Sequence, residues 1–472
     1  MLRRSGYCIL MVFCFSACKM SSKYEKPLTE TPSAWKNEEC QPSTSTAKIN
    51  HWWEVFASPT LNSLEQELLK KNYDLYIALQ KVCEARGAAG VAQSDLYPKL
   101  NLNAGYSFFQ EFIKYRQTSK EAVLPLKDKL TVNGQDYAFP NLFSYELDIF
   151  GKYKTNSKGA LLNADSKEEE MRSILLTLTT DLASYYFNIQ ALDILRSILE
   201  SESVILKSKL ELEELKFQKG LSNLITVSEI ETQLYLIQSG VDQNLKQRKL
   251  FENSIATLIG KPACTFLLKE ELNLPDEVPC ISSVIPSKVI MQRPDVASAE
   301  KFMESKYYLS RSAYLSFFPD FNITTALGYA SYQLKNFLNL KAFLWQAGAN
   351  LAQTIFDGKK KASEYNASLA RFKQAEGNYK LVILKAFQEV ESALASSYQE
   401  KLRSEKIYNA YLSSSRKDLL TYQRYEKGLS SKLEKYNSEL AVLAIQQTYV
   451  SVKLTRYQAT LDLIKALGGS WN

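Results

Sequence analysis

Proline is missing from most of this chain. The 472 residues contain thirteen prolines, yet none lies between Pro140 and Pro262 and none follows Pro319. Proline inside a helix costs about 3 kcal/mol because it removes a backbone hydrogen bond and clashes with the preceding turn. The stretches 152–218 and 359–427 contain one glycine each and are rich in helix-forming residues. We therefore predict two helices of about 100 Å each, far longer than the helices of globular proteins.

Each long helix is predicted to be followed by a second one that runs back along it. Both stretches end in the sequence Lys-Gly-Leu-Ser, at 219–222 and 427–430, and another helical pattern follows. Glycine at the end of one helix and serine at the start of the next are typical C-terminal and N-terminal caps. The sequence therefore predicts two helical hairpins, 152–259 and 358–468, each with a tight tip.

Histidine and clustered cysteine are also scarce. His51 is the only histidine, and it stands in no motif. Beyond the N-terminal segment the cysteines are Cys40, Cys83, Cys264 and Cys280, and none of them forms a CxxC pair. The sequence has neither a glycine-rich phosphate loop nor a nucleophile elbow, so we predict no enzyme activity, no cofactor and no metal site. Cys264 and Cys280 flank one linker and are interpreted either as a disulfide or as free buried thiols.

Charge of one sign is not in large excess. Fifty-eight Lys and Arg residues stand against 51 Asp and Glu residues, which gives a formal net charge of +7 at pH 7. The two signs are interleaved along the chain, as is typical of solvated helix faces. A nucleic-acid-binding surface is therefore not expected.

Long apolar runs are absent, so the sequence predicts no transmembrane helix. The chain opens with two arginines and the short apolar run 7–15, and small residues precede Cys18. This pattern resembles a bacterial lipoprotein signal, 1–17, that is removed before a lipid-modified (palmitate-bearing) Cys18. The alternative is an ordinary signal that is cut nearby and leaves Cys18 unmodified. The segment 18–60 begins with a polar, proline-containing stretch, which predicts an extended, lipid-anchored tether.

The second half of the chain repeats motifs of the first. The glycines of three motif pairs are 207, 208 and 208 residues apart, and a fourth pair upstream is offset by 221. The pairs are 148–152 with 355–359, 219–222 with 427–430, 258–260 with 466–468, and 97–101 with 318–322. We predict an internal duplication with repeats 61–260 and 293–469, joined by the linker 261–292. Each repeat is expected to contain a leading helix, two strands and a long hairpin.

Four segments ahead of the hairpins alternate apolar residues with small or polar ones, at the period of a strand. They are 99–108, 140–150, 320–332 and 343–356. Segments of about ten residues have the length of a tilted membrane strand. Aromatic residues near their ends resemble an interfacial girdle. The alternative is a soluble antiparallel sheet with one buried face.

Four strands cannot close a barrel in lipid, because open edges leave backbone groups without partners. Several chains must therefore share one barrel if the strands are membranous. Two chains would give eight strands and three would give twelve. The number is left open by the strand pattern alone.

The order of several further motifs carries a resemblance to a known family. They are 52–56, 58–61, 71–75, 96–98, 146–151, 293–296, 355–358 and the two Gly-Leu-Ser tips. The chain resembles the TolC-like outer-membrane efflux proteins, in their lipoprotein (NodT-type) branch. The resemblance implies an α+β membrane protein, in which antiparallel coiled-coil helices form an α-barrel and four strands per chain join a twelve-stranded transmembrane β-barrel.

The resemblance also implies the function. It predicts a homotrimer in the cell outer membrane that reaches into the periplasm. Such a trimer is a passive conduit, which docks to a periplasmic adaptor and receives substrates from an inner-membrane pump. Export of small toxic compounds and secretion of proteins remain alternatives within this interpretation. The alternative from another class is a non-conducting periplasmic lipoprotein scaffold.

The resemblance assigns roles to residues at the two tips. The adaptor-contacting positions are Gly220, Leu221, Ser222, Gly428, Leu429 and Ser430. The periplasmic pore constriction falls on Glu434 and Asn437, with Thr226 at the position of Glu434 in the first half. Three copies of Glu434 would favour cations, although lysines lie nearby. The alternatives are that the tips are only helix caps and that Glu434 lies on a solvated helix face.

Overall fold

The computed structural model describes residues 24–27, 32–36, 51–114, 129–275, 278–279, 281 and 286–469. Contacts divide the chain into two units. The strand unit comprises Met1–Lys26, Glu84–Ala164 and Phe302–Ala375. The helix unit comprises Pro27–Cys83, Asp165–Lys301 and Glu376–Asn472. The predicted signal and Cys18 lie outside the described residues.

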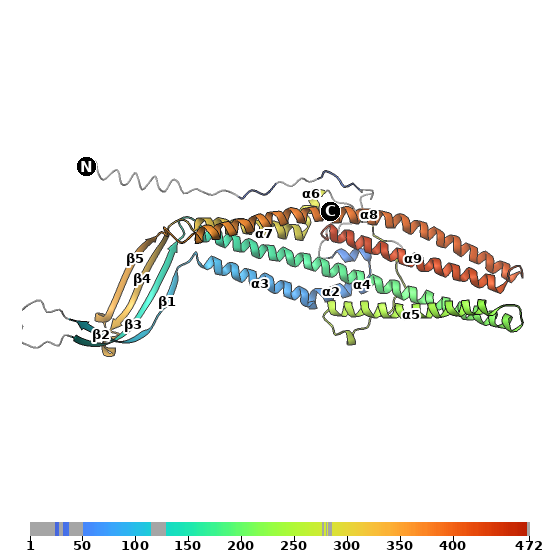
Figure 1. Cartoon of the computed structure of the whole chain (residues 1–472), viewed down its shortest axis with the longest axis horizontal. Coiled ribbons are helices and arrows are strands. Elements are labelled where there is room, and N and C mark those ends of the chain that lie inside the picture. The colour runs from blue at the N-terminus through green and yellow to red at the C-terminus, as the bar shows by residue number, and fades with distance from the viewer. Residues whose placement is uncertain are drawn as a thin grey trace, which may run out of the picture. The chain divides into compact units, whose positions relative to one another are not determined.

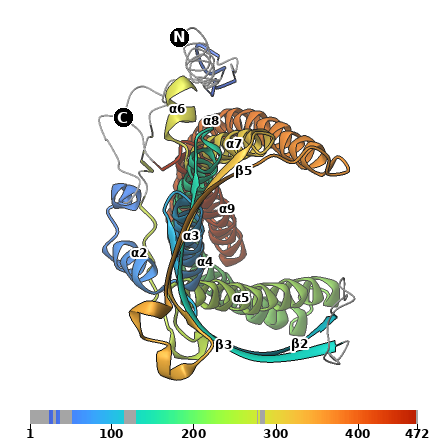
Figure 2. The same cartoon turned by 90° about the vertical axis from the view of Figure 1, so that its left-hand side faces the viewer.

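The strand unit contains one antiparallel sheet, which Figure 1 shows beside the ends of the long helices. Its strands are β1 (Lys99–Leu102), β2 (Gly105–Lys114), β3 (Lys129–Leu147), β4 (Asp320–Ser331) and β5 (Phe343–Ala352). The order is β1-β3-β4-β5, and β2 also pairs with β3. Two short 3₁₀ helices, η3 (Leu334–Asn336) and η4 (Leu340–Ala342), connect β4 to β5. Figure 2 shows these strands as a curved sheet.

Three of the predicted strands differ from the observed ones. The segment 99–108 is two strands rather than one, because the ladder is interrupted opposite Pro140. Proline has no N–H to complete the ladder, and only its carbonyl accepts a hydrogen bond, from the Asn103 N–H at 3.3 Å. The segment 140–150 belongs to a strand of 19 residues that begins at Lys129.

The remaining strand boundaries lie closer to the prediction. The predicted strand 343–356 ends at Ala352, before the turn that leads to the next helix. The strand β4 lies within one residue of the predicted 320–332.

The helices fall into pairs of equal length, although the pairs lie about 200 residues apart. The helices α4 (Lys152–Gln218) and α8 (Lys360–Glu426) have 67 residues each. The helices α5 (Leu224–Leu258) and α9 (Lys432–Ala466) have 35 each. The helices α3 (Tyr73–Ser94) and α7 (Pro294–Leu315) have 22 each. The prediction of long helical hairpins is thus matched by the structure.

Shorter elements complete the helix unit. They are η1 (Trp52–Phe56), α2 (Pro59–Lys71), η2 (Ala263–Thr265) and α6 (Pro286–Gln292). No helix in the described ranges is both long enough and apolar enough to cross a bilayer.

Aromatic residues form the core of the helix unit. Trp52 and Trp53 of η1 are 0% and 2% exposed, and the Trp52 indole Nε1 donates to Thr179 Oγ1 at 3.1 Å. The rings of Phe187 and Tyr457 lie in the same cluster with their centres 4.5 Å apart and their planes tilted by 36°. The segment 18–60 is therefore not an extended tether throughout, because η1 is part of the core.

The N-terminal segment makes two further contacts. In the helix unit, buried Trp35 packs edge-on against Phe387, with ring centres 5.9 Å apart. In the strand unit, the ring of Tyr24 lies 5.4 Å from that of Tyr307 on α7. Parts of this segment thus lie against helices.

A buried ion pair links α4 to α5 in the helix unit. Arg248 Nε donates to Asp193 Oδ1 at 2.5 Å, and the two side chains are 8% and 1% exposed. The same guanidinium donates to the Leu268 carbonyl at 2.9 Å. Because these groups satisfy one another, the charges can be held away from water.

Candidate functional site

One face of the sheet is apolar and exposed. Residues that are paired across antiparallel strands share a face, so the register defines this apolar face from strand to strand. Its large apolar residues are Leu100, Leu102, Phe143, Tyr145, Leu147, Phe321, Ile323, Leu327, Tyr329, Phe343, Trp345 and Leu351, and two polar residues, Asn141 and Thr325, lie among them. Leu100 is 75% exposed and Trp345 is 70% exposed. A soluble sheet would bury such a face, so the described chain leaves it available to a partner or to lipid.

The opposite, polar face carries small and amide side chains. Its small and amide residues are Asn101, Ser144, Asn322, Thr324, Ala326, Gln346, Gly348 and Asn350, and two leucines, Leu142 and Leu344, lie among them. The alternation that the sequence predicts therefore continues across the sheet in register. An apolar outer face and a polar inner face are typical of membrane β-barrels.

The sheet has two open edges. In the described chain, the outer edges of β1, β2 and β5 pair with no other strand. An open edge offers unpaired N–H and C=O groups to another strand. The sheet is four strands wide, since β1 and β2 follow one another along β3.

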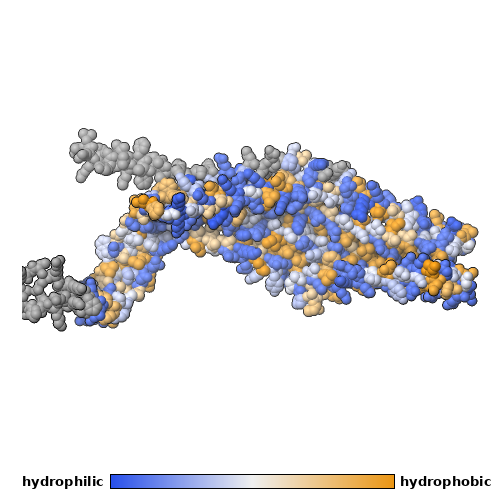
Figure 3. All heavy atoms as spheres, in the orientation of Figure 1, coloured by the Kyte–Doolittle hydropathy of each residue, from blue (hydrophilic) through white to orange (hydrophobic). Residues whose placement is uncertain are grey.

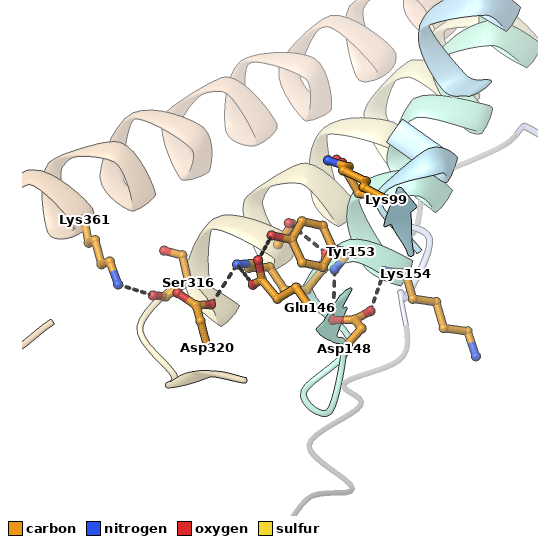
Figure 4. Close-up of polar contacts among 11 residues, drawn as sticks. Lys99, Glu146, Asp148, Tyr153, Lys154, Ser316, Asp320 and Lys361 are labelled. Carbon is orange, nitrogen blue, oxygen red and sulfur yellow. Dashed lines mark hydrogen bonds and ion pairs between the residues drawn. The ribbon is translucent and has the colours of Figure 1, made fainter. Parts of the chain in front are cut away.

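Where strands pass into helices, one lysine joins two carboxylates, as Figure 4 shows. Lys152 Nζ donates to Glu146 Oε1 at 2.9 Å and to Asp320 Oδ1 at 2.8 Å. The Tyr153 hydroxyl donates to Glu146 Oε2 at 2.6 Å. The sequence offered no signal for this cluster, because Lys152 and Asp320 lie 168 residues apart.

The surroundings set the protonation states of this cluster. Burial would lower the pKa of the Lys152 ammonium, but its hydrogen bonds to Asp320 and Glu146 outweigh burial and raise that pKa. Burial, together with the hydrogen bond to Glu146, raises the pKa of the Tyr153 hydroxyl to about 12. Lys152 is therefore charged and Tyr153 is neutral at neutral pH, which suits a structural clamp.

Aspartates in the repeated motifs cap the long helices. Asp148 accepts hydrogen bonds from the Tyr153 N–H at 3.1 Å and the Lys154 N–H at 2.7 Å. Asp357 accepts from the Lys361 N–H at 2.9 Å. A carboxylate at a helix N-terminus also interacts favourably with the helix dipole. The repeated Asp-Gly motifs thus begin the helices that the proline-free stretches predict.

The two hairpin tips have the same backbone. Gly220 and Gly428 both have φ of +72°, a conformation that favours glycine. The Leu221 N–H donates to the Lys216 carbonyl at 2.8 Å, and the Leu429 N–H donates to the Arg424 carbonyl at 2.9 Å. Both patterns are Schellman caps. Leu221 and Leu429 remain 78% and 67% exposed.

The tip serines have a different role from the predicted one. The N-caps of α5 and α9 are Asn223 and Ser431, so the assignment of Ser222 and Ser430 as N-caps is wrong by one residue. Ser222 Oγ donates to Glu213 Oε1 at 2.5 Å instead. That hydrogen bond lowers the pKa of Glu213, and the nearby Lys216 lowers it further by a smaller amount. Ser430 Oγ donates to Glu434 Oε2 at 2.6 Å.

The residues predicted at the pore constriction lie in the first turns of α5 and α9. The Glu434 N–H donates to Ser431 Oγ at 3.1 Å, and the Thr226 N–H donates to Asn223 Oδ1 at 2.9 Å. Glu434 and Thr226 therefore occupy the same capping position in the two hairpins. Asn437 lies exposed one turn further along α9.

The two tips differ in their side chains. An open groove of about 580 Å³ on the first tip is lined by Leu224, Ile225, Ser228, Glu229, Thr232 and Gln233. Leu224 and Ile225 are 60% and 70% exposed. On the second tip, Lys435 Nζ instead lies 5.0 Å from the ring centre of Tyr422. Figure 3 shows apolar residues among hydrophilic ones at the hairpin ends.

Two observations concern possible metal ligands and the cysteine thiols. No group of three metal-binding side chains occurs in the portion of the chain that the structure describes. Cys83 and Cys264 carry exposed free thiols, so the interpretation as buried thiols is wrong for Cys264. The proposed partner of Cys264, Cys280, lies outside the described residues.

Curated proteins match nearly the full length of the chain. Cation efflux system protein CusC of Escherichia coli O6:H1 is 24% identical, over 98% of this chain and 99% of CusC. The probable outer membrane lipoprotein SilC of Salmonella typhimurium is 27% identical, over 98% of each chain.

Solved structures share the fold. The open state of the Neisseria gonorrhoeae MtrE outer membrane channel has a TM-score of 0.80 at 23% identity, over 96% of this chain and 98% of MtrE. The outer-membrane channel OprN has a TM-score of 0.81 at 20% identity, over 96% of this chain and 100% of OprN. The family model described as "Outer membrane efflux protein" matches residues 64–261 and 285–469. This chain therefore belongs to the outer membrane efflux protein family.

Proposed function

We propose that this chain is the outer-membrane channel of a tripartite efflux system and acts as a passive homotrimeric conduit. The observation that carries the proposal is the exposed apolar face of a sheet that is four strands wide and open at both edges. Three such sheets, joined edge to edge, make a closed barrel of twelve strands. Closure provides partners for the edge groups, as a membrane strand requires.

The trimer would place the polar face of the sheet around a wet lumen. Small and amide side chains such as Asn322, Thr324 and Asn350 offer hydrogen bonds without narrowing the channel. A barrel of eight strands is essentially filled by its own side chains, whereas a wider one leaves room for water. This difference supports three copies rather than two.

The helical hairpins would continue the conduit across the periplasm. Two hairpins of equal length from each chain would form the wall of an α-barrel. We attribute the equal lengths of α4 and α8, and of α5 and α9, to an internal duplication. The two segments that the family model matches support the same division.

The hairpin tips are the proposed contact with a periplasmic adaptor. Leu221 and Leu429 are exposed at the ends of both hairpins, and the first tip adds the groove at Leu224 and Ile225. Exposed apolar residues in a groove are typical of a protein contact. Energy and choice of cargo would come from the inner-membrane pump. The relatives are named for different cargoes, among them cations, pyoverdine and toluene.

Two further roles belong to the same proposal. A lipid on Cys18 would anchor each chain to the outer membrane, as the name of SilC suggests for that relative. Glu434, with Thr226 and Asn437, would line the periplasmic constriction. The exposure of Glu434 and its place in the first turn of α9 support this position.

The test is single-channel conductance of the purified protein in a planar bilayer, after its mass has been measured in detergent. We expect a trimer that gives discrete openings. Glu434→Ala should enlarge the openings and lower their cation preference, whereas the isosteric Glu434→Gln should lower the preference alone. A monomer without conductance at any voltage would refute the conduit.

A further inference from the structure

Part of the sheet extends beyond the strands that support it. The strand β4 ends with Ser331 opposite Tyr137, so among the described strands residues 129–136 of β3 pair with β2 alone. Figure 1 shows this two-stranded ribbon running past the ends of β4 and β5. An isolated two-stranded ribbon is only marginally stable in water. The ribbon is therefore expected to gain stability from a surface that it contacts.

The inner face of the ribbon is covered by its own side chain. Phe109 lies opposite Gly134 on the continuation of the polar face. A Cβ on Gly134 would lie 2.3 Å from the Phe109 ring, so the ring packs directly on this glycine. An aromatic ring over a strand glycine fills the gap that the missing side chain leaves. The inner face thus needs no external partner here.

The outer face of the ribbon remains open. It continues the apolar face, and its three pairs nearest to β4 are Tyr106 with Tyr137, Phe108 with Gln135 and Gln110 with Asn133. Two further pairs, Phe112 with Thr131 and Lys114 with Lys129, follow on the same face toward the end of the ribbon. Tyr106 and Phe108 are 59% and 62% exposed, and the rings of Tyr106 and Tyr137 lie 5.0 Å apart. The three rings lie toward the Tyr106–Tyr137 pair and the three amides toward the Gln110–Asn133 pair, and none of these six side chains is charged.

The length of β3 fixes the height of this face in a membrane. The ten-residue step from Leu147 to Tyr137 is about 34 Å along the strand and about 24 Å along the bilayer normal at a tilt of 45°. This matches the apolar band of an outer-membrane barrel, which is about 25 Å tall. Phe108 and Gln110, opposite Gln135 and Asn133, then lie about 5 and 10 Å above the band, at the level of the headgroups.

We infer that this outer face binds the sugar headgroups of glycolipid in the outer leaflet. Aromatic rings stack on the C–H faces of sugar rings, and amides both donate to and accept from sugar hydroxyls. Phosphate recognition uses Lys or Arg; the three pairs at the level of the rings contain neither, and the register places Lys114 and Lys129 two pairs further along the ribbon. The inference rests on the proposed function, because it takes the apolar face to be in contact with lipid.

The experiment uses the full-length protein in phospholipid nanodiscs that contain lipopolysaccharide. Native mass spectrometry counts the lipopolysaccharide molecules retained per trimer, and it compares molecules that carry the full core sugars with lipid A that carries none. The test variants are Phe108→Ala and Gln110→Ala. The matched control is Phe109→Ala, which removes the same ring from the opposite face. Phe108→Tyr keeps a ring at the test position.

We expect the wild type to retain the full-core form preferentially. Phe108→Ala should reduce this preference about tenfold, as truncation of an interface aromatic commonly does. Phe108→Tyr and Phe109→Ala should preserve it. Equal retention of lipid A without sugars, or an unchanged preference in Phe108→Ala, would overturn the inference.

Mass and conductance, measured on the same samples, separate this inference from the proposed function. A conducting trimer without sugar preference refutes the sugar contact alone. A monomer that does not conduct refutes the conduit, and the lipid-facing assignment of the ribbon is refuted with it.

Discussion

Gly328 is the glycine of the sheet at which substitution by alanine should destabilise the protein most. A Cβ there would lie 2.0 Å from the Phe139 carbonyl oxygen and 2.8 Å from the Pro140 Cα. Carbon and oxygen atoms normally approach no closer than about 3.3 Å, so β3 and β4 would have to separate by more than 1 Å. The obstructing atoms belong to the backbone and cannot rotate away. We expect Gly328→Ala to cost about 3 kcal/mol, at the upper end for overpacking.

Hydrogen exchange measures this cost locally. A loss of about 3 kcal/mol in local opening free energy accelerates exchange about a hundredfold for amides that exchange through that opening. The amides of β4 report it, because they lie in the ladder with β3. Mass spectrometry of peptic fragments that cover 320–331 would give the rates.

Gly348→Ala in the neighbouring strand is the matched control. A Cβ at Gly348 would lie 3.8 Å from the nearest atom, Thr324 Oγ1, which is an ordinary contact. This change should leave the exchange of β4 unaltered or slow it slightly, since alanine restricts the unfolded chain. Equal acceleration in both variants would show that loss of glycine, rather than the close approach to Phe139, controls the sheet.

Three further changes address charged groups. Glu213→Gln tests the first tip. The pKa of Glu213 in the folded protein lies below its ordinary value of 4.5, so the ionised carboxylate stabilises the fold above that value. This stabilisation is lost as the pH falls through the lowered pKa. The urea midpoint of the wild type should therefore fall more steeply below pH 5 than that of the variant, and parallel curves would contradict this. Asp193→Asn should cost about 3 kcal/mol in urea unfolding, because buried Arg248 loses its nearer carboxylate and keeps only Glu252, 3.5 Å away. Asp193→Leu combined with Arg248→Met and Glu252→Gln, which removes all three charges, should cost less; the reverse order would refute the argument. Lys152→Met leaves its two carboxylate partners facing one another and should cost about 1–3 kcal/mol at pH 7. That loss should shrink as acid protonates the carboxylates, and a loss independent of pH would point to packing instead.

The helices were predictable because their signals are local. Proline cannot lie inside a helix, so long stretches without it allowed hairpins to be located from the sequence. Glycine in the left-handed conformation marks a helix end, so the tips at Gly220 and Gly428 were predicted at the residue where the chain turns. The capping residue was missed by one position, because serine, asparagine and aspartate all serve as caps.

The sheet was predictable where one face is apolar and the other is not. The stretch 133–136 of β3 lacks that contrast, because it consists of polar residues and one glycine, so no strand was predicted there. Only its pairing with β2 makes it a strand. The junction at Lys152 could not be predicted for a similar reason. Its partner Asp320 is brought to it by the pairing of β3 with β4, which no local pattern encodes.

The contact between Tyr24 and Tyr307 would restrict the position of the lipid proposed for Cys18. Six residues span at most about 21 Å when fully extended, so the proposed lipid on Cys18 would enter the membrane within that distance of Tyr24. Tyr307 is followed by eight residues of α7, about 12 Å of helix, before the chain approaches β4. The lipid would therefore hold each chain at the membrane close to that chain's own strands. A newly exported monomer would then search for its partners in two dimensions rather than three.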